Sequence, residues 1–232
     1  MSFWDGKRVL VTGGTGFIGS HCVERLLNLG AHVRVTTHNP SETAEYLSAV
    51  RPHIDLLELD LACMDDAEQA VAQQDILIHL AAYVAGVEYN SSHPVYMLQR
   101  NIEIGLPVMT AAAESGLERI VCVSSACVYT RHCSIPTPEH EGFLGDPEPT
   151  NFGYGWAKRL LEVHARGLHQ QFDVGVTIVR PYNGYGPRDN FSDETSHVIP
   201  ALIKRADQEV EVFPVWGDGQ QTRSFLYVSD FV

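Results

Sequence analysis

The feature that most constrains this chain is a glycine cluster directly after a short apolar run near its start. Residues 9–12 read Val-Leu-Val-Thr, and Gly14, Gly16 and Gly19 then follow the spacing G-x-G-x-x-G. An apolar-periodic segment continues to Leu29, so the pattern predicts a strand, a tight turn and a helix. Glycine is the residue type that lets a backbone turn sharply and approach another backbone closely.

There is a physical reason for glycine at each of these positions in the turn. The early glycines let the backbone approach a pyrophosphate, and Gly19 lets the helix lie close to the strand. The N-terminus of the helix then presents unpaired N–H groups and a partial positive charge to the phosphates. We therefore predict a dinucleotide site, with an unliganded glycine-rich turn as the alternative. The predicted contacts are Gly13, Gly14, Gly16, Phe17, Ile18 and Gly19.

Strand and helix patterns alternate along the chain. Strands are expected at 8–12, 32–37, 54–59, 76–80 and 119–124, and helices at 16–29, 41–50, 67–73, 96–114 and 154–171. Near-continuous apolar strands in repeated strand–helix units predict an α/β fold, a doubly wound parallel sheet of the Rossmann type. We expect residues 1–186 to form this domain. Residues 187–232 are expected to form part of a small substrate-binding region that returns to the sheet.

Composition narrows the function. The formal net charge of -13 over 232 residues disfavours nucleic acid and anionic membrane surfaces as partners. The 5 cysteines include no C-x-x-C pair, which indicates reduced thiols in a cytoplasmic protein. We expect no signal peptide and no membrane span, because the first residues lack the required layout and no apolar run is long enough.

Ligands of such sheets lie beyond the carboxyl ends of the strands. After the second strand the chain reads Thr36-Thr37-His38-Asn39, and the first acid, Glu42, comes late. An acid here normally holds the ribose hydroxyls of NAD, so its absence favours NADP. No Arg or Lys between residues 35 and 50 is present to hold the extra phosphate, so NAD stays the alternative. Further cofactor contacts are expected at Thr37, His38, Asp60, Leu61, Leu80, Ala81 and Ala82.

Three residues have the chemistry of a proton-transfer site. Ser125 follows the fifth strand, and Tyr154 and Lys158 lie four residues apart at the start of a later helix, so they share one helix face. A nearby ammonium lowers the pKa of a phenol, which favours the phenolate as proton acceptor. Ser125 is able to hydrogen-bond the same substrate oxygen. We predict these three residues to be catalytic, with Tyr154 and Lys158 also in contact with the cofactor.

Several segments, in order, resemble the extended short-chain dehydrogenase/reductase family, the NAD-dependent epimerases and dehydratases. They are T-G-G-T-G-F-I-G at 12–19, H-L-A-A at 79–82, S-S-A-C-V-Y at 124–129, Y-G-W-A-K at 154–158, R-P-Y-N-G-Y-G-P at 180–187 and W-G-D-G to R-S-F at 216–225. The resemblance covers the whole chain and implies an NAD(P) cofactor, a nucleotide-diphosphate sugar as substrate and a homodimer. The family normally continues past residues 227–230 with a small closing domain. We therefore expect a whole cofactor half and an incomplete, apparently truncated substrate region.

The residue at position 127 indicates which members of this family the chain resembles most. Nucleotide-sugar 4,6-dehydratases carry Asp-Glu where this chain has Ala126 and Cys127, whereas Ser-x-Cys resembles the GDP-mannose 3,5-epimerases and GDP-L-fucose synthases. In both groups this cysteine is an acid/base beside a 4-keto group, and the second acid/base of the synthases falls on His197. A thiol and an imidazole titrate near neutrality, which suits such proton transfers. The structural alternatives are a small buried apolar residue for Cys127 and a helix-capping or solvated histidine for His197.

The same resemblance suggests the substrate contacts. They are Asn183, Arg188 and Arg223, of which the arginines match the oxygens of a diphosphate. The alternative for both arginines is that they are surface charges without a substrate contact, and this alternative is stronger for Arg188 than for Arg223. A zinc site built from Cys127, His132, Cys133 and His140 is disfavoured, because the spacing fits no closed site well, and no metal is expected.

These observations together predict a nucleotide-sugar epimerase or epimerase/reductase. It would act through a 4-keto-hexose, with hydride exchange at C4 and proton transfer at C3 and C5. One alternative is a plain nucleotide-sugar 4-epimerase, in which Cys127 and His197 are bystanders. An alternative of another class is a catalytically incomplete, cofactor-binding regulatory or scaffold protein. The set of Ser125, Tyr154 and Lys158 argues against that class, because binding alone does not require it.

Overall fold

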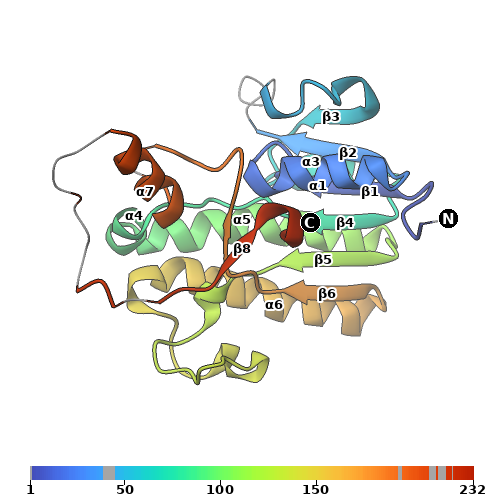
Figure 1. Ribbon diagram of the computed structural model, residues 1–232. Helices are drawn as coiled ribbons and strands as arrows, with labels where there is room; N and C mark the ends of the chain where they lie inside the picture. Colours follow the sequence, from blue (N-terminus) through green and yellow to red (C-terminus); the bar gives the residue numbers. More distant parts are fainter. Residues whose placement is uncertain (1, 39–44, 193–194, 209–212, 214–217, 221) are drawn as a thin grey trace.

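A six-stranded parallel sheet forms the centre of the computed structural model (Figure 1). The structure describes residues 2–38, 45–192, 195–208, 213, 218–220 and 222–232. The strands of the sheet are β1 (Arg8–Thr12), β2 (His32–Thr37), β3 (Ile54–Glu58), β4 (Ile76–His79), β5 (Arg119–Val123) and β6 (Gly175–Val179). Their order across the sheet is β3-β2-β1-β4-β5-β6, which is the doubly wound order with a reversal between β1 and β4.

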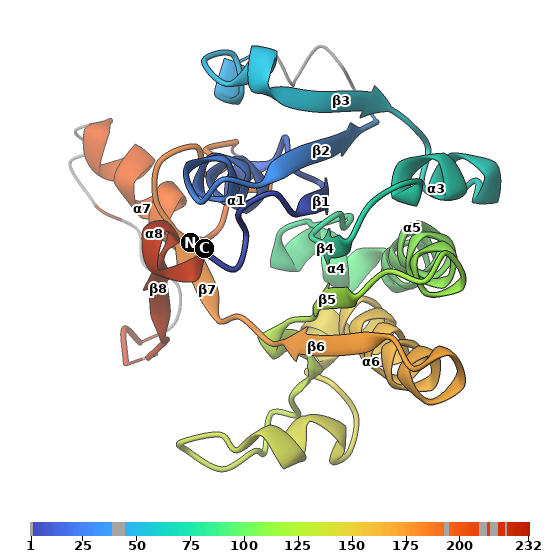
Figure 2. The ribbon, with the colours of Figure 1, turned by 90° about the vertical axis from the view of Figure 1, so that its right-hand side faces the viewer.

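Helices cover both faces of this sheet (Figure 2). On one face lies α1 (Phe17–Asn28), and on the other lie α3 (Met64–Val71), α5 (Pro94–Glu114) and α6 (Phe152–Phe172). Each face therefore has its own hydrophobic core. Val9, Val11 and Val23 belong to the core under α1, while Leu10, Leu77 and Leu161 belong to the core under α5 and α6. Alternate residues of β1 point to opposite faces, so this strand contributes to both cores.

Shorter elements lie outside the six-stranded sheet. They are α4 (Val87–Ser92), β7 (Asn183–Tyr185), α7 (Val198–Asp207), β8 (Phe225–Tyr227), α8 (Val228–Phe231) and the 3-10 turns η1 (Arg51–His53), η2 (Ala126–Val128), η3 (Glu139–Phe143) and η4 (Pro149–Asn151). Strands β7 and β8 pair in parallel as a separate small sheet. This pair joins residues on the two sides of the expected domain boundary at residue 186. In Figure 1, α7 lies on the side toward which the strands of the large sheet point.

The elements predicted from the sequence are present with small shifts at their ends. The Rossmann-type parallel sheet is confirmed. Helix α3 begins at Met64 rather than 67 because Asp65 and Asp66 favour the positive end of a helix. Of the helix expected at 41–50, residues 41–44 lie outside the described part, and residues 45 and 46 are helical. Strand β6 was not predicted, although its Val-Thr-Ile-Val sequence is typical of a strand. No helix in the described part of the chain is long and apolar enough to cross a membrane.

The packing of α1 onto the turn after β1 predicts an intolerance at Gly19. A Cβ atom added at Gly19 would lie 2.1 Å from the carbonyl oxygen of Gly13, which is backbone and has no flexible side chain to move. We expect Gly19→Ala to lower the free energy of unfolding by about 1–3 kcal/mol, measured by urea titration. In the matched control Gly167→Ala on α6, an added Cβ meets no atom within 4 Å, and the change is expected to stabilise by about 0.5–1 kcal/mol. Equal stability of Gly19→Ala and the parent protein would contradict this account of the turn.

Candidate active site

The reversal of strand order between β1 and β4 creates the site. The two strands are neighbours in the sheet, but the connections that leave their carboxyl ends cross to opposite faces, which opens a crevice between them. Residues that follow β1, β4 and β5 therefore meet at one edge of the sheet. These residues form the glycine turn after β1, the H-L-A-A segment after β4 and the S-S-A-C segment after β5.

The glycine turn fits a dinucleotide. Gly13 has a φ of +66°, and a Cβ atom there would lie 2.8 Å from the backbone nitrogen of Ala81. Gly16 is different, because a Cβ there would find no atom closer than 3.4 Å. Gly16 is also the N-cap of α1, which has neither a side-chain cap nor an acid in its first turn. The N–H groups of Phe17 and Ile18 belong to the first turn of this helix, whose positive end suits a pyrophosphate.

The end of β4 is fastened to the end of β1 by Thr12. Its hydroxyl lies 2.9 Å from His79 Nδ1 and accepts a hydrogen bond from the backbone N–H of Ala81 at 3.2 Å. His79 is fully buried, and burial together with the charge of Lys158 lowers its pKa to about 3. This imidazole is therefore neutral throughout the physiological range. Leu80, Ala81 and Ala82, predicted as cofactor contacts, follow directly and are partly buried along the crevice.

The adenosine side of the crevice is formed by residues that follow β2 and β3. Thr37 is buried at the end of β2, and His38 after it is exposed. Asn39 and Glu42, which entered the cofactor prediction, lie outside the described residues. Asp60 is exposed after β3, and one of its oxygens accepts a hydrogen bond from the backbone N–H of Ala62 at 3.1 Å. The side chain of Leu61 belongs to the hydrophobic core, so a cofactor would meet it through its backbone.

Tyr154 and Lys158 lie on one face of α6, beside the end of β5. The Lys158 ammonium is 5.6 Å from the centre of the Tyr154 ring and donates a hydrogen bond to the carbonyl oxygen of Val123 at 2.9 Å. Ser125 lowers the pKa of the Tyr154 hydroxyl, and its side chain accepts a hydrogen bond from the backbone N–H of Cys127 at 3.1 Å. The structure therefore brings Ser125, Cys127, Tyr154 and Lys158 together, as their sequence positions predicted.

The charge states of this group differ from the sequence expectation. Burial raises the pKa of Tyr154 above its usual value, and the hydrogen bond with Ser125 opposes that shift without overcoming it. The expectation of a low pKa for Tyr154 is wrong for this structure, because burial and the charge of Cys127 both raise that pKa. Burial likewise raises the pKa of the Cys127 thiol, against the opposing effects of Ser125 and Lys158. Both groups therefore carry their protons near neutral pH.

His197 lies apart from these four residues. It is the N-cap residue of α7, its side chain is exposed, and its electrostatic neighbour is the carboxylate of Asp189. Asp189 is buried, with 7% of its surface exposed, and burial raises its pKa while the charge of His197 lowers it. The acid/base role of His197 stays a prediction.

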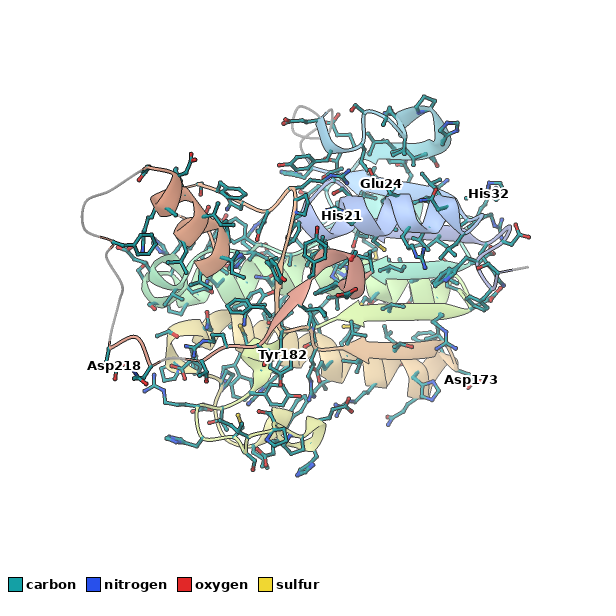
Figure 3. All side chains as sticks on the ribbon, in the orientation of Figure 1. His21, Glu24, His32, Asp173, Tyr182 and Asp218 are labelled. Atoms are coloured by element: carbon teal, nitrogen blue, oxygen red, sulfur yellow. The ribbon has the colours of Figure 1, made fainter. Side chains whose placement is uncertain are left out.

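The predicted substrate contacts have structural partners of their own. Arg188 donates to the Glu24 carboxylate on α1 at 2.7 Å, close to where His21 meets the carbonyl of Pro187 at 3.0 Å; His21 and Glu24 are labelled on α1 in Figure 3. Asn183 donates from β7 to the carbonyl of Ser224 at 3.0 Å. Arg223 is exposed and donates to the carbonyl of Thr222 at 2.7 Å. Arg223 also acts on Glu148, whose pKa it helps to lower after the larger effect of Arg131.

Sequence reasoning missed a set of buried polar residues behind the site. Glu162 is completely buried on α6, and it binds Ser124 on the segment after β5 and Arg180 on the segment after β6. The signal was available, because Glu162 follows Tyr154 and Lys158 at successive steps of four and so shares their helix face. A carboxylate on the buried face of a helix implies a cationic partner, which sequence alone did not identify.

The fold and this site define a Rossmann-type dinucleotide-binding protein with a serine, tyrosine, lysine and cysteine beside the cofactor position. Across the described ranges, no group of three or more His, Cys, Asp or Glu side chains is placed to hold a metal ion.

Comparison with known proteins identifies the family. The model of the NAD dependent epimerase/dehydratase family matches residues 9–232, and the chain belongs to this family. It is 34% identical to a probable GDP-L-fucose synthase of Drosophila melanogaster over 97% of this chain and 69% of that protein. Its fold matches that of a UDP-N-acetylglucosamine 4-epimerase from Methanobrevibacter ruminantium with a TM-score of 0.84 and 30% identity, over 97% of this chain and 70% of that one. A GDP-L-fucose synthetase from Naegleria fowleri bound to NADP matches with a TM-score of 0.73 and 27% identity, over 98% and 71%.

The buried state of His79 predicts a pH dependence of stability. The unfolded chain protonates this imidazole near pH 6.5, whereas the folded protein protonates it only near pH 3. Between these values the unfolded state binds more protons, so the free energy of unfolding falls as pH falls, by up to about 1.4 kcal/mol per pH unit for this group. We expect urea titrations from pH 6.5 to 5.5 to show a smaller slope in His79→Gln than in the parent. The exposed control His32→Gln should keep the parent slope, and an unchanged slope in His79→Gln would contradict the assignment.

Proposed function

We propose that this chain is an NAD(P)-dependent nucleotide-sugar epimerase or epimerase/reductase. The observation that carries the proposal is the meeting of Ser125, Cys127, Tyr154 and Lys158 at the carboxyl edge of the sheet, next to the glycine turn. The relatives support the substrate class, because the names GDP-L-fucose synthase and UDP-N-acetylglucosamine 4-epimerase both denote enzymes that act on nucleotide sugars.

Different residues around the crevice would bind the cofactor and the substrate. The turn from Gly13 to Gly19 would hold the pyrophosphate of the cofactor with its N–H groups, and Asp60 would accept from the adenine amino group. Arg223 and Arg188 would meet the diphosphate of the substrate, with Asn183 beside them. The ion pair with Glu24 presets the direction of the Arg188 guanidinium and leaves its Nη1 atom without a hydrogen-bond partner among the described residues.

The bound cofactor supplies hydride exchange at C4 of the sugar. Tyr154 moves the proton at the C4 oxygen, Ser125 holds that oxygen, and Lys158 stabilises the phenolate form. The surroundings of Tyr154 support these roles, because Ser125 acts on the pKa of its hydroxyl, and the Lys158 ammonium lies over its ring. The raised pKa of Tyr154 means that this residue begins as a proton donor, as reduction of a 4-keto group requires.

Cys127 and His197 would move the protons at C3 and C5. Inversion at a carbon beside a ketone needs a donor on one face and an acceptor on the other. The Cys127 thiol keeps its proton because burial raises its pKa, which suits the donor role. His197 is exposed at the start of α7, where an imidazole is able to exchange protons with solvent, which suits the acceptor role.

Proton transfer at C3 and C5 is tested by deuterium. We expect incubation with nucleotide-diphosphate hexoses and their 4-keto forms in D₂O to place deuterium at C3 or C5, detected by mass spectrometry and NMR. Cys127→Ser should reduce this incorporation by about 10²–10⁴-fold, because a general acid/base is lost, while dinucleotide binding stays intact. The matched control is Cys63→Ser, which changes an exposed thiol. Full incorporation by Cys127→Ser would contradict the role of this cysteine.

A plain 4-epimerase is the second candidate. The fold similarity to the Methanobrevibacter ruminantium 4-epimerase favours it, at a TM-score of 0.84. The same experiment separates the two, because a 4-epimerase interconverts the C4 epimers without bringing solvent deuterium to C3 or C5.

We further propose NADP as the cofactor. The end of β2 presents buried Thr37 and exposed His38, and neither carries a negative charge that would repel a 2′-phosphate. The NADP-bound relative from Naegleria fowleri supports the same choice. NAD is the alternative.

A charge placed at the end of β2 tests the cofactor choice. Isothermal titration should show tighter binding of NADP than of NAD to the parent protein. In His38→Asp the new carboxylate repels the 2′-phosphate and accepts from the ribose hydroxyls, so the ratio of the two affinities should shift toward NAD by about tenfold or more. Glu118→Gln, at the opposite edge of the sheet, is the control and should leave the ratio unchanged. Tighter binding of NAD by the parent would overturn the proposal.

A homodimer in the cytoplasm completes the proposal. Leu160 and Val163 are exposed on α6, at 43% and 53%, which gives this helix an apolar outer face next to α5. Such a face is typical of a helix that packs against another subunit.

A further inference from the structure

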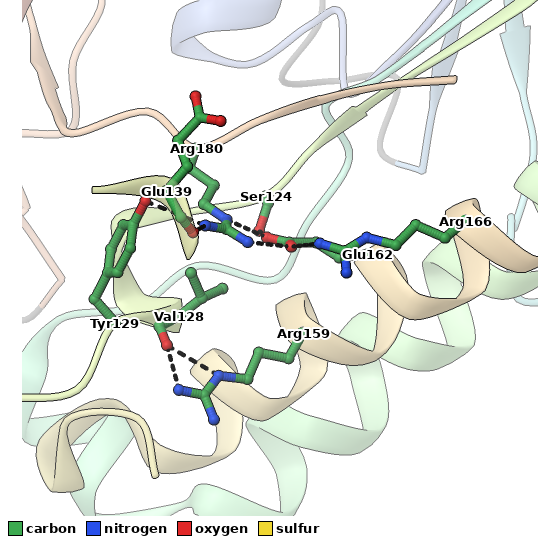
Figure 4. Close-up of polar contacts among 8 residues, drawn as sticks. All are labelled: Ser124, Val128, Tyr129, Glu139, Arg159, Glu162, Arg166 and Arg180. Atoms are coloured by element: carbon green, nitrogen blue, oxygen red, sulfur yellow. Dashed lines mark hydrogen bonds and ion pairs between the residues drawn. The ribbon is translucent and has the colours of Figure 1, made fainter. Parts of the chain in front are cut away.

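Residues Val123–Tyr129, which we call the Ser/Cys segment, are held by side chains from two other elements. Figure 4 shows these contacts, which come from α6 and from the residue after β6. Lys158 donates to the Val123 carbonyl at 2.9 Å. The next residue of α6, Arg159, donates twice to the Val128 carbonyl, at 2.9 and 2.6 Å. Both ends of the segment are thus fastened to the helix that carries Tyr154.

The Ser/Cys segment is also held near its start by a buried charge. The Ser124 hydroxyl donates to Glu162 Oε1 at 2.6 Å. Arg180 forms a fork with the same carboxylate, through Nε to Oε1 and Nη2 to Oε2, both at 2.7 Å. The side chain of Glu162 is 0% exposed and that of Arg180 is 11% exposed. Arg166 is a distant third partner, at 3.5 Å and half exposed.

Arg180 also reaches the end of the Ser/Cys segment. Its Nη1 atom donates to the Tyr129 hydroxyl at 3.2 Å and to the carbonyl oxygen of Glu139 at 2.5 Å. One guanidinium therefore binds α6 through Glu162 and the segment through Tyr129. Because the guanidinium is planar and its donors have fixed directions, it sets the distance between the two.

We propose that Glu162 and Arg180 are positioning residues that fix Ser125 and Cys127 against Tyr154. This inference rests on the proposed function for the identity of the reaction, whereas the contacts themselves come from the structure. Ser124, the residue that Glu162 binds, precedes Ser125 directly in the chain. Tyr154, Lys158 and Glu162 lie on one face of a single helix, so the carboxylate holds the serine at a set height along that face.

A role in stability alone explains these contacts less well. A buried ion pair contributes little net stability, because desolvation of the two charges offsets their attraction, and an apolar pair of the same volume often serves as well. An apolar pair has no means of binding the Ser124 and Tyr129 hydroxyls. Through these bonds the ion pair fixes the direction of the Ser/Cys segment. That direction matters because a misplacement of about 1 Å in an active site costs about 10²-fold in rate.

Ser124→Ala tests the proposal with the least disturbance. It removes the bond to Glu162 and leaves the ion pair with Arg180 in place. We expect turnover in the Ser124→Ala variant to fall by about ten- to a hundredfold with little change in KM or in dinucleotide affinity. Glu162→Gln and Arg180→Lys are expected to act in the same direction. The control Glu118→Gln breaks an exposed pair with Lys7 and should leave turnover unchanged.

A double-mutant cycle separates positioning from stability. If Ser124 acts through Ser125, then Ser124→Ala added to Ser125→Ala should slow turnover by no more than about a further twofold. A contribution to stability alone would lower the rate by the same factor in both backgrounds. Independent, multiplicative losses in the cycle would overturn the proposal.

A second measurement does not depend on turnover. The Ser125 hydrogen bond and the Lys158 charge hold down the pKa of Cys127 against burial, and Tyr154 also faces the thiol. Displacement of Ser125 weakens the first effect while Lys158 and Tyr154 are unchanged. The midpoint of iodoacetamide alkylation of Cys127 against pH, followed by peptide mapping, should therefore move to higher pH in Ser124→Ala and not in Glu118→Gln. An unchanged midpoint in Ser124→Ala would overturn the positioning role. A shifted midpoint in a protein that turns over no nucleotide sugar would support positioning and overturn the proposed function instead.

Discussion

The structure around the site depends on one buried carboxylate. Glu162 has no exposed surface, and a carboxylate in that position is tolerated only when charged and hydrogen-bonded groups surround it. Arg180 supplies the charge and Ser124 supplies a hydroxyl, so three chain segments meet at a single pair of oxygens. Removal of one partner would leave an uncompensated charge in the core, which typically costs about 3–5 kcal/mol. Helix α6 and the ends of β5 and β6 are therefore bound to move together.

The opposite side of the crevice is built from backbone rather than charge. Gly13 brings the turn after β1 close to Ala81, Gly14 brings it close to Val35, and Gly19 brings α1 close to the turn itself. No Cβ fits at any of the three glycines without displacing a neighbour. Thr12 then joins this turn to β4 through His79 and Ala81. The two sides are near enough to interact electrostatically, because the charge of Lys158 on α6 lowers the pKa of His79 on β4. A cofactor bound at the turn would thus lie within the electrostatic field of Lys158.

Much of the arrangement was predictable from particular residues. Apolar strands such as 76–79 and the glycine spacing predicted the parallel sheet and its ligand edge, because periodicity and glycine geometry are local properties. The four-residue spacing of Tyr154 and Lys158 predicted their shared face, and the strand-end position of Ser125 predicted their meeting. The pKa of Tyr154 was misjudged because its largest cause is burial, and burial depends on neighbours distant in the sequence. Strand β6 was missed because it is a short run at the edge of the sheet.

By itself, the sequence determined which residue types stand at the positions that local geometry requires. Glycine stands where two backbone segments approach closely, and apolar residues stand where strands are covered on both sides. A serine, cysteine, tyrosine and lysine stand at the ends of strands and helices. Only the tertiary structure decided which of these groups lose their water and which charges face one another. It paired Glu162 with Arg180, joined Arg188 to Glu24, and kept the proton on Cys127. The physical reason is that spacing along a helix or strand is a short-range property of the chain, whereas desolvation and ion pairing arise only when residues far apart in sequence are packed together.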